Sequence, residues 1–364
     1  MTLLEKYAAL LVDYCLEIKK NDRLFIKTTL LAEPLVKEIY KATLDRGGHL
    51  ETEFIFEGQN KILFDRAKLH QIEYISPTTW YRFENFEKYL FIRAPYNLFE
   101  DKNIDGEKLK IRADATKPLN DLYFERTANG SMERSLCQFP TQASAQAAEM
   151  ALDDYQEFVY AACKLYDKDP SQSWLQVRLQ QQSVTDFLNQ SKNIIYRGEN
   201  IDISFSCSGR TWINSDGRAN MPSGEVFTAP VEDSVNGEVY FSYPAIYRGN
   251  EVIGVRLTFK DGYITNWSAE KGQEVLNDIF KIEGARRLGE AAIGTNYNIQ
   301  RITRNILFDE KIGGSIHLAV GQAYKQCGGK NRSSVHWDMI TDMKKDGQII
   351  ADGKVIYERG KFLI

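Results

Sequence analysis

The sequence lacks the features that mark several large classes of protein. No run of about 18 apolar residues occurs among its 364 residues, which predicts that no segment spans a membrane. Lysine and arginine form no basic run and the formal net charge is −4, so nucleic acid is not an expected partner. The sequence also has no GxGxxG, P-loop, HExxH or CxxC motif. Neither a nucleotide site nor a standard zinc site is therefore predicted.

Cysteine is also scarce, and its pattern does not suggest disulfides. The five cysteines are odd in number and scattered along the chain, at Cys15, Cys137, Cys163, Cys207 and Cys327. We expect reduced thiols in a cytoplasmic protein. The N-terminal segment is not read as a signal peptide, because Glu5, Asp13 and Glu17 interrupt its apolar part and no small-residue cleavage site follows. Its apolar residues recur at helical spacing, which predicts an amphipathic helix.

What is present is typical of a globular protein. Hydrophobic residues make up 43% of the chain and aromatic residues 12%. A chain of this length exceeds one ordinary core, which favours two domains. The polar segment 167–173 contains one proline and is the best linker candidate. We therefore expect an N-terminal domain at 1–170 and a C-terminal domain at 171–364.

The first half alternates between short apolar runs and helical patterns. Pro34 stands near the start of one such helix, where its missing N–H costs nothing, and Gly47 and Gly48 end it. A strand–helix–strand unit of this length favours a right-handed parallel crossover. An α/β domain with a largely parallel sheet is predicted. Its expected strands are 22–28, 49–56, 89–94 and 134–139, and further helices are expected at 60–72, 106–116 and 144–166.

The pattern of apolar and polar residues is different in the second half. After a predicted helix over 174–191, apolar and polar residues alternate between turn signals at 198–200, 249–250 and 261–262. This pattern predicts a mainly antiparallel β domain with additional helices over 271–292 and 317–326. The whole chain is thus expected to combine α/β and α+β architecture.

Two of the only four histidines, His317 and His336, lie in this second half, and Asp338 follows His336 by two positions. In an extended segment, residues two apart point to the same face, so His336 and Asp338 can reach one ion while Trp337 points into the opposite layer. An imidazole and a carboxylate suit Zn, Co, Mn or Fe. The alternative is two unrelated histidines, one in the core and one on the surface.

Two glutamates stand among apolar neighbours, where a carboxylate is costly to bury unless it is paired or coordinated. Glu225 lies in a strand-like stretch after a proline turn, and the alternative for it is an exposed position on a hairpin. Glu290 falls in a predicted helix, where Arg286 and Arg287 at i−4 and i−3 are alternative partners.

Other polar residues of this region are candidates for supporting roles. Tyr324 follows His317 by seven positions, and a helix would place both on one face. Asp309 and Glu310 are either partners that orient imidazoles or exposed loop carboxylates. Cys327 is interpreted as a bystander.

The same segments carry a resemblance to a known family. The second half contains, in order, NMPSGEVFTAP, LGEAAIGTN, FDEKIGGSIHLAVGQAY, GGKNRSSVHWDMI and DGKVIYERGKF, and the first half contains FPTQASAQAAEM. Together they resemble the aminopeptidase T / aminopeptidase S family of two-domain metallopeptidases. The resemblance covers the whole second half in order and spacing and continues more faintly through the first half. Ser223 departs from the family pattern, which leaves the substrate preference open.

This resemblance implies a site with two divalent ions (Zn, Co, Mn or Mg). Its metal-binding residues fall on Glu225, Glu290, His317, His336 and Asp338, and its active-site tyrosine falls on Tyr324. The implied protein is a cytoplasmic homodimer with an enclosed site that removes N-terminal residues from short peptides. Two ions would lower the pKa of the attacking water and bind the carbonyl oxygen. Glu290 is the expected general base, with Glu225 as its alternative.

Two other functions remain open from the sequence. His317, His336 and Asp338 also form the facial triad of a non-haem Fe(II) ring-cleaving dioxygenase, which resembles a relative on this fold. A single iron needs neither Glu225 nor Glu290, so the presence of both favours the peptidase. The third possibility is a non-catalytic peptide-binding relative, which a loss of ligand residues would support.

Overall fold

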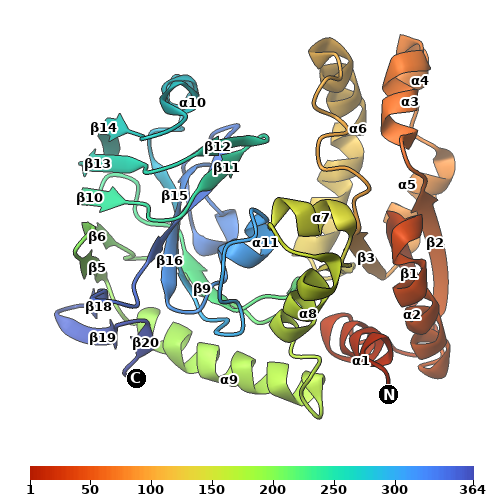
Figure 1. Cartoon of the computed structure of the whole chain (residues 1–364), viewed down its shortest axis with the longest axis horizontal. Helices are drawn as coiled ribbons and strands as arrows, with labels where there is room; N and C mark the ends of the chain where they lie inside the picture. Colours follow the sequence, from red (N-terminus) through yellow and green to blue (C-terminus); the bar gives the residue numbers. More distant parts are fainter. The chain divides into compact units, whose positions relative to one another are not determined.

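A five-stranded parallel sheet organises the first of two units into which the chain divides (Figure 1). The computed structural model describes all residues from Met1 to Ile364. The first unit comprises Met1–Gln172 and Gly217–Pro222, and the second comprises Ser173–Asp216 and Ser223–Ile364. The parallel sheet has the order β2-β1-β3-β4-β8. Its strands are β1 (Arg23–Thr29), β2 (His49–Ile55), β3 (Lys88–Arg93), β4 (Glu133–Gln138) and β8 (Asn220–Met221).

Helices connect the strands of this first unit. They are α1 (Leu3–Ala9), α2 (Glu33–Asp45), α3 (Gln59–Arg66), α4 (Leu69–Ile72), α5 (Pro77–Asn85), α6 (Gly106–Ala128), α7 (Gln142–Ala147) and α8 (Leu152–Ala162). The Thr2 side chain caps α1, and a π-helical segment, Leu10–Cys15, continues it with its apolar side buried. The predicted N-terminal helix, the four strands and their parallel pairing are confirmed. Strand β8 was not predicted, because two residues carry no periodic pattern.

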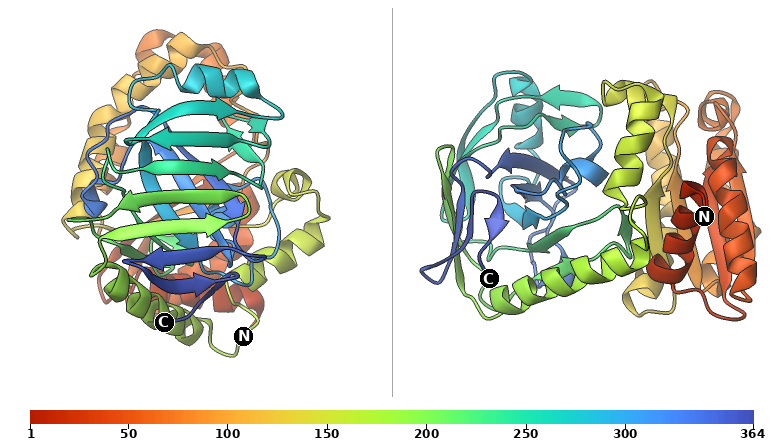
Figure 2. Two further views of the ribbon diagram at one scale, coloured as in Figure 1. Left: turned by 90° about the vertical axis from the view of Figure 1, so that its left-hand side faces the viewer. Right: turned by 60° about the horizontal axis from the view of Figure 1, so that its bottom comes forward.

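Two antiparallel sheets form the second unit. The larger sheet has the order β14-β13-β10-β6-β5-β18-β19-β20 and faces the viewer in Figure 2, left. Its strands are β5 (Asn193–Gly198), β6 (Ile201–Ser206), β10 (Asn236–Tyr240), β13 (Arg256–Lys260), β14 (Tyr263–Ser268), β18 (Gln348–Ala351), β19 (Lys354–Glu358) and β20 (Lys361–Phe362). The smaller sheet has the order β17-β16-β15-β9-β7. Its strands are β7 (Ile213–Ser215), β9 (Glu225–Thr228), β15 (Leu288–Gly294), β16 (Ser315–Gly321) and β17 (His336–Asp342).

The remaining elements of the second unit lie around these sheets. They are the hairpin β11 (Ala245–Tyr247) and β12 (Asn250–Val252), the helices α9 (Pro170–Leu188), α10 (Gln273–Ile279) and α11 (Ile306–Asp309), and a 3₁₀ turn at Lys325–Cys327. The three predicted hairpin turns are confirmed by the pairs β5/β6, β11/β12 and β13/β14.

The hydrophobic core of this unit lies between the two sheets. Both sheets contribute fully or almost fully buried side chains to one cluster. The smaller sheet supplies Val226, Ile293, Leu318, Trp337 and Met339, and the larger supplies Tyr196, Ile203, Leu257 and Ile349. These residues alternate along their strands with residues of the opposite face, as the period of an extended chain requires. The smaller sheet therefore has one face committed to the core and one face free for other groups.

Two predicted helices of the second half are wrong. The segment 271–292 forms the short helix α10 and then enters strand β15, and 317–326 forms most of strand β16 followed by a 3₁₀ turn. In both segments the strand is buried on both sides, so apolar residues occupy both faces and the alternation is lost, although each strand carries one ionisable residue, Glu290 or His317. Such runs are ambiguous between helix and strand when periodicity is the only guide.

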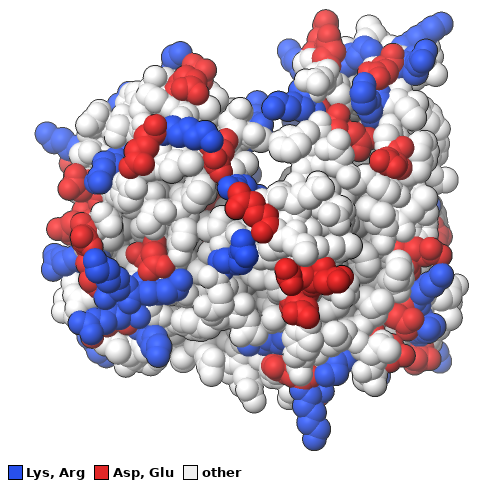
Figure 3. Space-filling view, in the orientation of Figure 1, with Lys and Arg blue, Asp and Glu red and all other residues white.

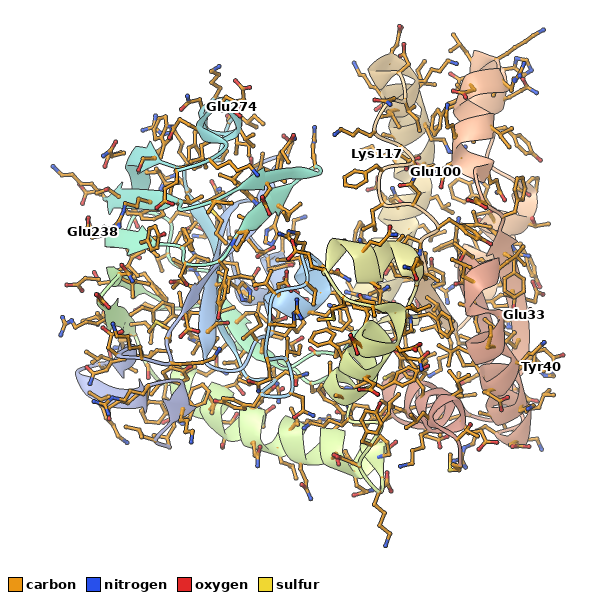
Figure 4. The ribbon with its side chains drawn as sticks, in the orientation of Figure 1. Glu33, Tyr40, Glu100, Lys117, Glu238 and Glu274 are labelled. Carbon is orange, nitrogen blue, oxygen red and sulfur yellow. The ribbon has the colours of Figure 1, made fainter.

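The surface agrees with the mixed composition. Figure 3 shows acidic and basic side chains interspersed over the face in view. On the second unit, Glu238 of β10 and Glu274 of α10 are exposed and point outward (Figure 4). No helix combines the length and the apolar character needed to cross a bilayer.

One prediction concerns the end of β16, beside the start of β17. Gly321 has a φ of +99°, and an added Cβ would lie 2.2 Å from the Val335 carbonyl oxygen. Backbone strain and overpacking together predict that Gly321→Ala lowers the free energy of unfolding by about 2–5 kcal/mol in urea denaturation. Gly353→Ala is the control, since Gly353 has a φ of +84° but open space around it. It should lose only about 1–2 kcal/mol, and equal losses would contradict the steric argument.

Candidate metal centre

Four neighbouring strands of the smaller sheet bring the predicted ligand residues together. The register pairs Ala319 of β16 with both Glu290 of β15 and Asp338 of β17. His317 lies two residues before Ala319, and His336 two before Asp338, so all of these side chains share one face. On β9, Glu225 lies two residues before Phe227, which is in register with Ala292 and through it with His317. All five predicted ligands therefore project from the face that does not pack on the core.

Small residues make room for this cluster. Ala292 and Ala319 stand between the ligand positions on the same face, and Gly321 is in register with His336. A second, smaller cluster of buried apolar residues borders the site on this face. It consists of Phe227, Ala229, Ala292, Ala323 and Cys327. The ligands thus lie in a low-dielectric environment, where charges interact more strongly than in water.

Glu290 occupies the centre of the cluster. Its Oε1 lies 3.6 Å from His317 Nε2, and its Oε2 lies 3.2 Å from His336 Nε2. His317 Nε2 is also 3.6 Å from Glu225 Oε2, and His336 Nε2 is 3.6 Å from Asp338 Oδ1. Each oxygen of Glu290 therefore faces a different histidine. The arrangement suits a carboxylate shared by two neighbouring cation positions.

Several buried polar atoms of the cluster have no hydrogen-bond partner. They include Glu225 Oε2, Asp338 Oδ1 and His317 Nδ1. A buried acceptor that is left unpaired is costly, and a carboxylate more so. Donor atoms of Glu290, His317 and Asp338 also lie within 4.8 Å of one another. These residues fit a divalent cation, because coordination would satisfy the unpaired oxygens.

The orientation of His336 is fixed from its other side. Its Nδ1 lies 2.8 Å from the Gln322 carbonyl oxygen, to which it donates as Nδ1–H. That hydrogen bond leaves Nε2 directed at Glu290 and Asp338. Backbone partners of this kind commonly hold a metal-binding imidazole in the required tautomer.

Attraction between the two imidazoles and the carboxylates dominates the electrostatics of the cluster. Burial alone would lower the pKa of both imidazoles, but Glu290 and the neighbouring carboxylates raise the pKa of His317 to about 9 and that of His336 to about 10. Burial would raise the pKa of Glu290, yet the two imidazoles lower it to about 2. Protons therefore compete with cations for the imidazoles, and metal affinity should fall as the pH drops through these values.

Lys311 is a site residue that the sequence did not reveal. Its side chain is completely buried, and its Nζ lies 3.0 Å from Glu225 Oε1 and also contacts Glu310 Oε1. Burial would lower the pKa of this ammonium, but Glu225 and Glu310 raise it above its usual value. The Lys311 ammonium thus holds one oxygen of Glu225, while the other oxygen faces His317. The alternative of an exposed Glu225 is wrong.

Tyr324 borders the cluster, although not through a helix. It follows the end of β16 and precedes the 3₁₀ turn. Its ring packs edge-on against the His336 ring at 5.0 Å and lies 5.4 Å from the Phe227 ring. Burial and the nearby carboxylates, Glu290 first among them, raise the pKa of its phenol, so the hydroxyl remains a donor. The predicted proximity to the site is confirmed, while the predicted helical relation to His317 is wrong.

The other candidates have different surroundings from those predicted. Asp309 is buried and accepts hydrogen bonds from the Thr303 amide and hydroxyl, so those bonds hold a loop rather than an imidazole. Arg286 and Arg287 donate to the carbonyl oxygens of Ile264 and Glu232, not to Glu290, because Glu290 lies in a strand.

Two further residues from the sequence analysis, Cys327 and Ser223, are buried near the site. Burial raises the pKa of the Cys327 thiol to about 12, which keeps it protonated and agrees with a bystander role. Ser223 is buried, and its hydroxyl donates to the Ser215 carbonyl oxygen at 2.9 Å. Its departure from the family pattern therefore falls on a residue that supports the β7/β9 pair.

The chain is similar to proteins of one family along nearly its whole length. The family model described as thermophilic metalloprotease (M29) matches residues 1–362. Aminopeptidase 2 of Geobacillus stearothermophilus is 30% identical, with 96% of this chain and 95% of that protein covered. Aminopeptidase PepS of Streptococcus thermophilus is 29% identical over 99% of this chain and 98% of its own length.

A solved structure has the same fold. Wild-type AmpT from Thermus thermophilus superimposes with a TM-score of 0.84 at 22% sequence identity, covering 100% of this chain and 99% of that one. The mixed α/β architecture predicted from the sequence is confirmed. The relatives are named aminopeptidases, which supports the metallo-aminopeptidase interpretation, whereas nothing among them supports the dioxygenase. This chain belongs to the thermophilic metalloprotease (M29) family.

Proposed function

We propose that this protein is an aminopeptidase that uses two divalent ions to remove N-terminal residues from short peptides. The observation that carries the proposal is the central position of Glu290, whose two oxygens face two different histidines. His317 has Glu225 as its second carboxylate neighbour, and His336 has Asp338. The five residues thus separate into two groups of three donor atoms that share Glu290.

Each residue of the cluster then has a task. One ion would be held by Glu225, His317 and Glu290, and the other by His336, Asp338 and Glu290. Zn, Co, Mn and Mg all accept such donors. Bound ions would supply the acidity of the attacking water and polarise the peptide carbonyl. Glu290, with Glu225 as the alternative, is proposed to accept the water's proton through a carboxylate oxygen that is not bonded to an ion at that step.

Tyr324 is proposed to stabilise the oxyanion that develops during hydrolysis. Its ring is held against His336 and Phe227, and its phenol remains protonated. A fixed hydroxyl donor at the edge of a buried site can stabilise negative charge in the transition state without reorganisation.

We also propose that the enzyme is a cytoplasmic homodimer. All five cysteines are buried and none forms a disulfide, which supports a reducing compartment such as the cytoplasm. A homodimer with an enclosed site would explain a restriction to short peptides. The aminopeptidase names of the relatives support peptides as substrates.

Blocking the substrate amine provides the first test of this function. An aminopeptidase site must recognise a free α-amine, so a panel of short peptides should release free N-terminal residues, while the N-acetylated forms stay intact. Released amino acids are measured by amine derivatisation with metal-loaded protein. Equal turnover of free and blocked peptides would exclude an aminopeptidase. Oxygen consumption with a dihydroxypyridine would instead support the dioxygenase.

Removing a ligand should remove metal and activity together. We expect His336→Ala and Asp338→Ala each to bind fewer than two ions per chain by elemental analysis and to lose hydrolysis, because the shared site loses a donor and its charges are unbalanced. The matched control is Asp342→Ala on the same strand, whose carboxylate accepts from Tyr243 and Lys344 instead. Full occupancy with two ions in either ligand variant would contradict the assignment.

The role of the Tyr324 hydroxyl is tested by Tyr324→Phe, which keeps the ring. The loss of a single preorganised donor predicts a kcat lower by about 10²–10³, with KM nearly unchanged and both ions retained. Steady-state kinetics and metal analysis check this result. Tyr297→Phe serves as the control, since the Tyr297 hydroxyl donates to the Gly360 carbonyl oxygen away from the cluster. A kcat within a few-fold of wild type would make the Tyr324 hydroxyl structural, and loss of an ion would make it a ligand.

A further inference from the structure

Two cavities lie at one end of the smaller sheet of the second unit, and the proposed function uses neither. Their volumes are about 570 Å³ and 590 Å³, which is the size of a small-molecule site. They share Glu232, Arg287 and Lys330, which belong to the segments after β9, before β15 and between β16 and β17. None of the five predicted metal ligands lines either cavity. The cavities are therefore separate from the metal centre.

Basic side chains outnumber acidic ones around these cavities. Five basic and three acidic side chains line the two cavities together. The basic ones are Arg210, Arg286, Arg287, Lys330 and Arg332. The whole chain has a formal net charge of −4, so this local excess is opposite in sign to the charge of the protein. An excess of positive charge around a cavity attracts anions.

Arg210 is a buried cation in the wall of the first cavity. Its side chain is only 5% exposed, and its Nη2 donates to Glu232 Oε2 at 2.5 Å, which fixes the direction of the guanidinium. Its Nε is buried and has no hydrogen-bond partner. A buried charged donor that is left unpaired is costly. An oxyanion bound in the cavity that Arg210 lines can supply the missing acceptor.

Glu232 holds the basic residues in place without neutralising all of them. Its Oε1 accepts a hydrogen bond from the Lys330 amide at 2.6 Å, and its carbonyl oxygen accepts one from Arg287 Nη1. The Arg287 guanidinium also stacks on the Tyr263 ring, with Cζ 3.8 Å from the ring centroid. The side chains of Lys330 and Arg332 are exposed and form no ion pair. These two cations are available to an anion.

Hydrogen bonds and close packing fix the loop that carries these two cations. The Asn331 side-chain amide donates to the carbonyl oxygens of Gly321 and Gly284. An added Cβ at Gly284 would clash with the Arg332 carbonyl oxygen, so the two loops are in close contact. The backbone that presents Lys330 and Arg332 is thus ordered before a ligand binds, which lowers the entropic cost of binding.

We propose that the two cavities form a binding site for phosphate, either free or as part of a small ester, with Arg210 and Lys330 as its main donors. A guanidinium has planar donors that match the oxygens of a phosphate, and an ammonium adds a point charge. The two cavities offer more space than a phosphate group fills, so an organic portion can lie beside the Tyr263 ring. This inference does not depend on the proposed peptidase activity.

Calorimetric titration of the metal-loaded protein with inorganic phosphate tests the site. We expect saturable binding of one phosphate per chain. In Lys330→Ala the affinity should be lower by about 10–100-fold, the value of a hydrogen bond to a charged group, while Lys330→Arg should stay within a few-fold of wild type. Lys325→Ala is the matched control, because Lys325 is an exposed lysine of the same loop that lines neither cavity. Equal affinities of Lys330→Ala and wild type, or an equal loss in Lys325→Ala, would overturn the proposal.

A ligand variant separates this site from the metal centre, because metal ions also bind phosphate. His336 lines neither cavity. His336→Ala should therefore bind inorganic phosphate with wild-type affinity even though it holds fewer ions. Loss of phosphate binding in His336→Ala would place the anion on the metal ions and overturn the proposal.

Phenyl phosphate, as a second titrant, distinguishes free phosphate from a phosphate ester. Because the cavities leave space beside the phosphate group, we expect phenyl phosphate to bind more tightly than inorganic phosphate, which identifies an ester as the ligand. Weaker binding of phenyl phosphate would identify free phosphate. If neither titrant binds saturably to the wild type, the site is overturned, and the tests of peptide hydrolysis are unaffected.

Discussion

The metal centre depends on the register of four antiparallel strands. Along β9, β15, β16 and β17, one set of alternating side chains completes the core of the second unit, and the other set supplies the charged cluster. A shift of any strand by one residue would exchange the two sets, placing carboxylates in the core and apolar groups in the site. The packing of Leu318, Trp337 and Met339 therefore fixes the ligand geometry as well as the fold.

The same register concentrates acidic groups that repel one another. Three carboxylates and two imidazoles project from one face, and the loop after α11 adds Glu310 beside them. Protonated imidazoles and Lys311 offset part of this charge, which explains why the pKa values of His317 and His336 rise while that of Glu290 falls. A pair of cations would replace those protons. Positive charge therefore stabilises the cluster both when the imidazoles carry protons and when metal ions replace them.

The sequence predicts well what local patterns determine. The parallel strands, the hairpin turns and the shared face of His336 and Asp338 follow from short-range spacing, and the combined motifs indicated the family. The helices expected over 271–292 and 317–326 failed because strands buried on both faces lose their alternation. Lys311 was missed for another reason. Its contact with Glu225 spans 86 positions, and a lysine between Glu310 and Ile312 looks like any solvated loop residue.

Strand β8 has a consequence for the integrity of the chain. This short strand pairs with β4 in the sheet of the first unit, yet in sequence it lies between β7 and β9 of the second. The chain therefore crosses between the units three times, after residues 172, 216 and 222. A fragment ending at Gln172 lacks the fifth strand of its own sheet, and the complementary fragment carries that strand within an insertion, Gly217–Pro222, that ends three residues before Glu225. Neither unit is a contiguous module that could be exchanged, duplicated or expressed intact by a single cut.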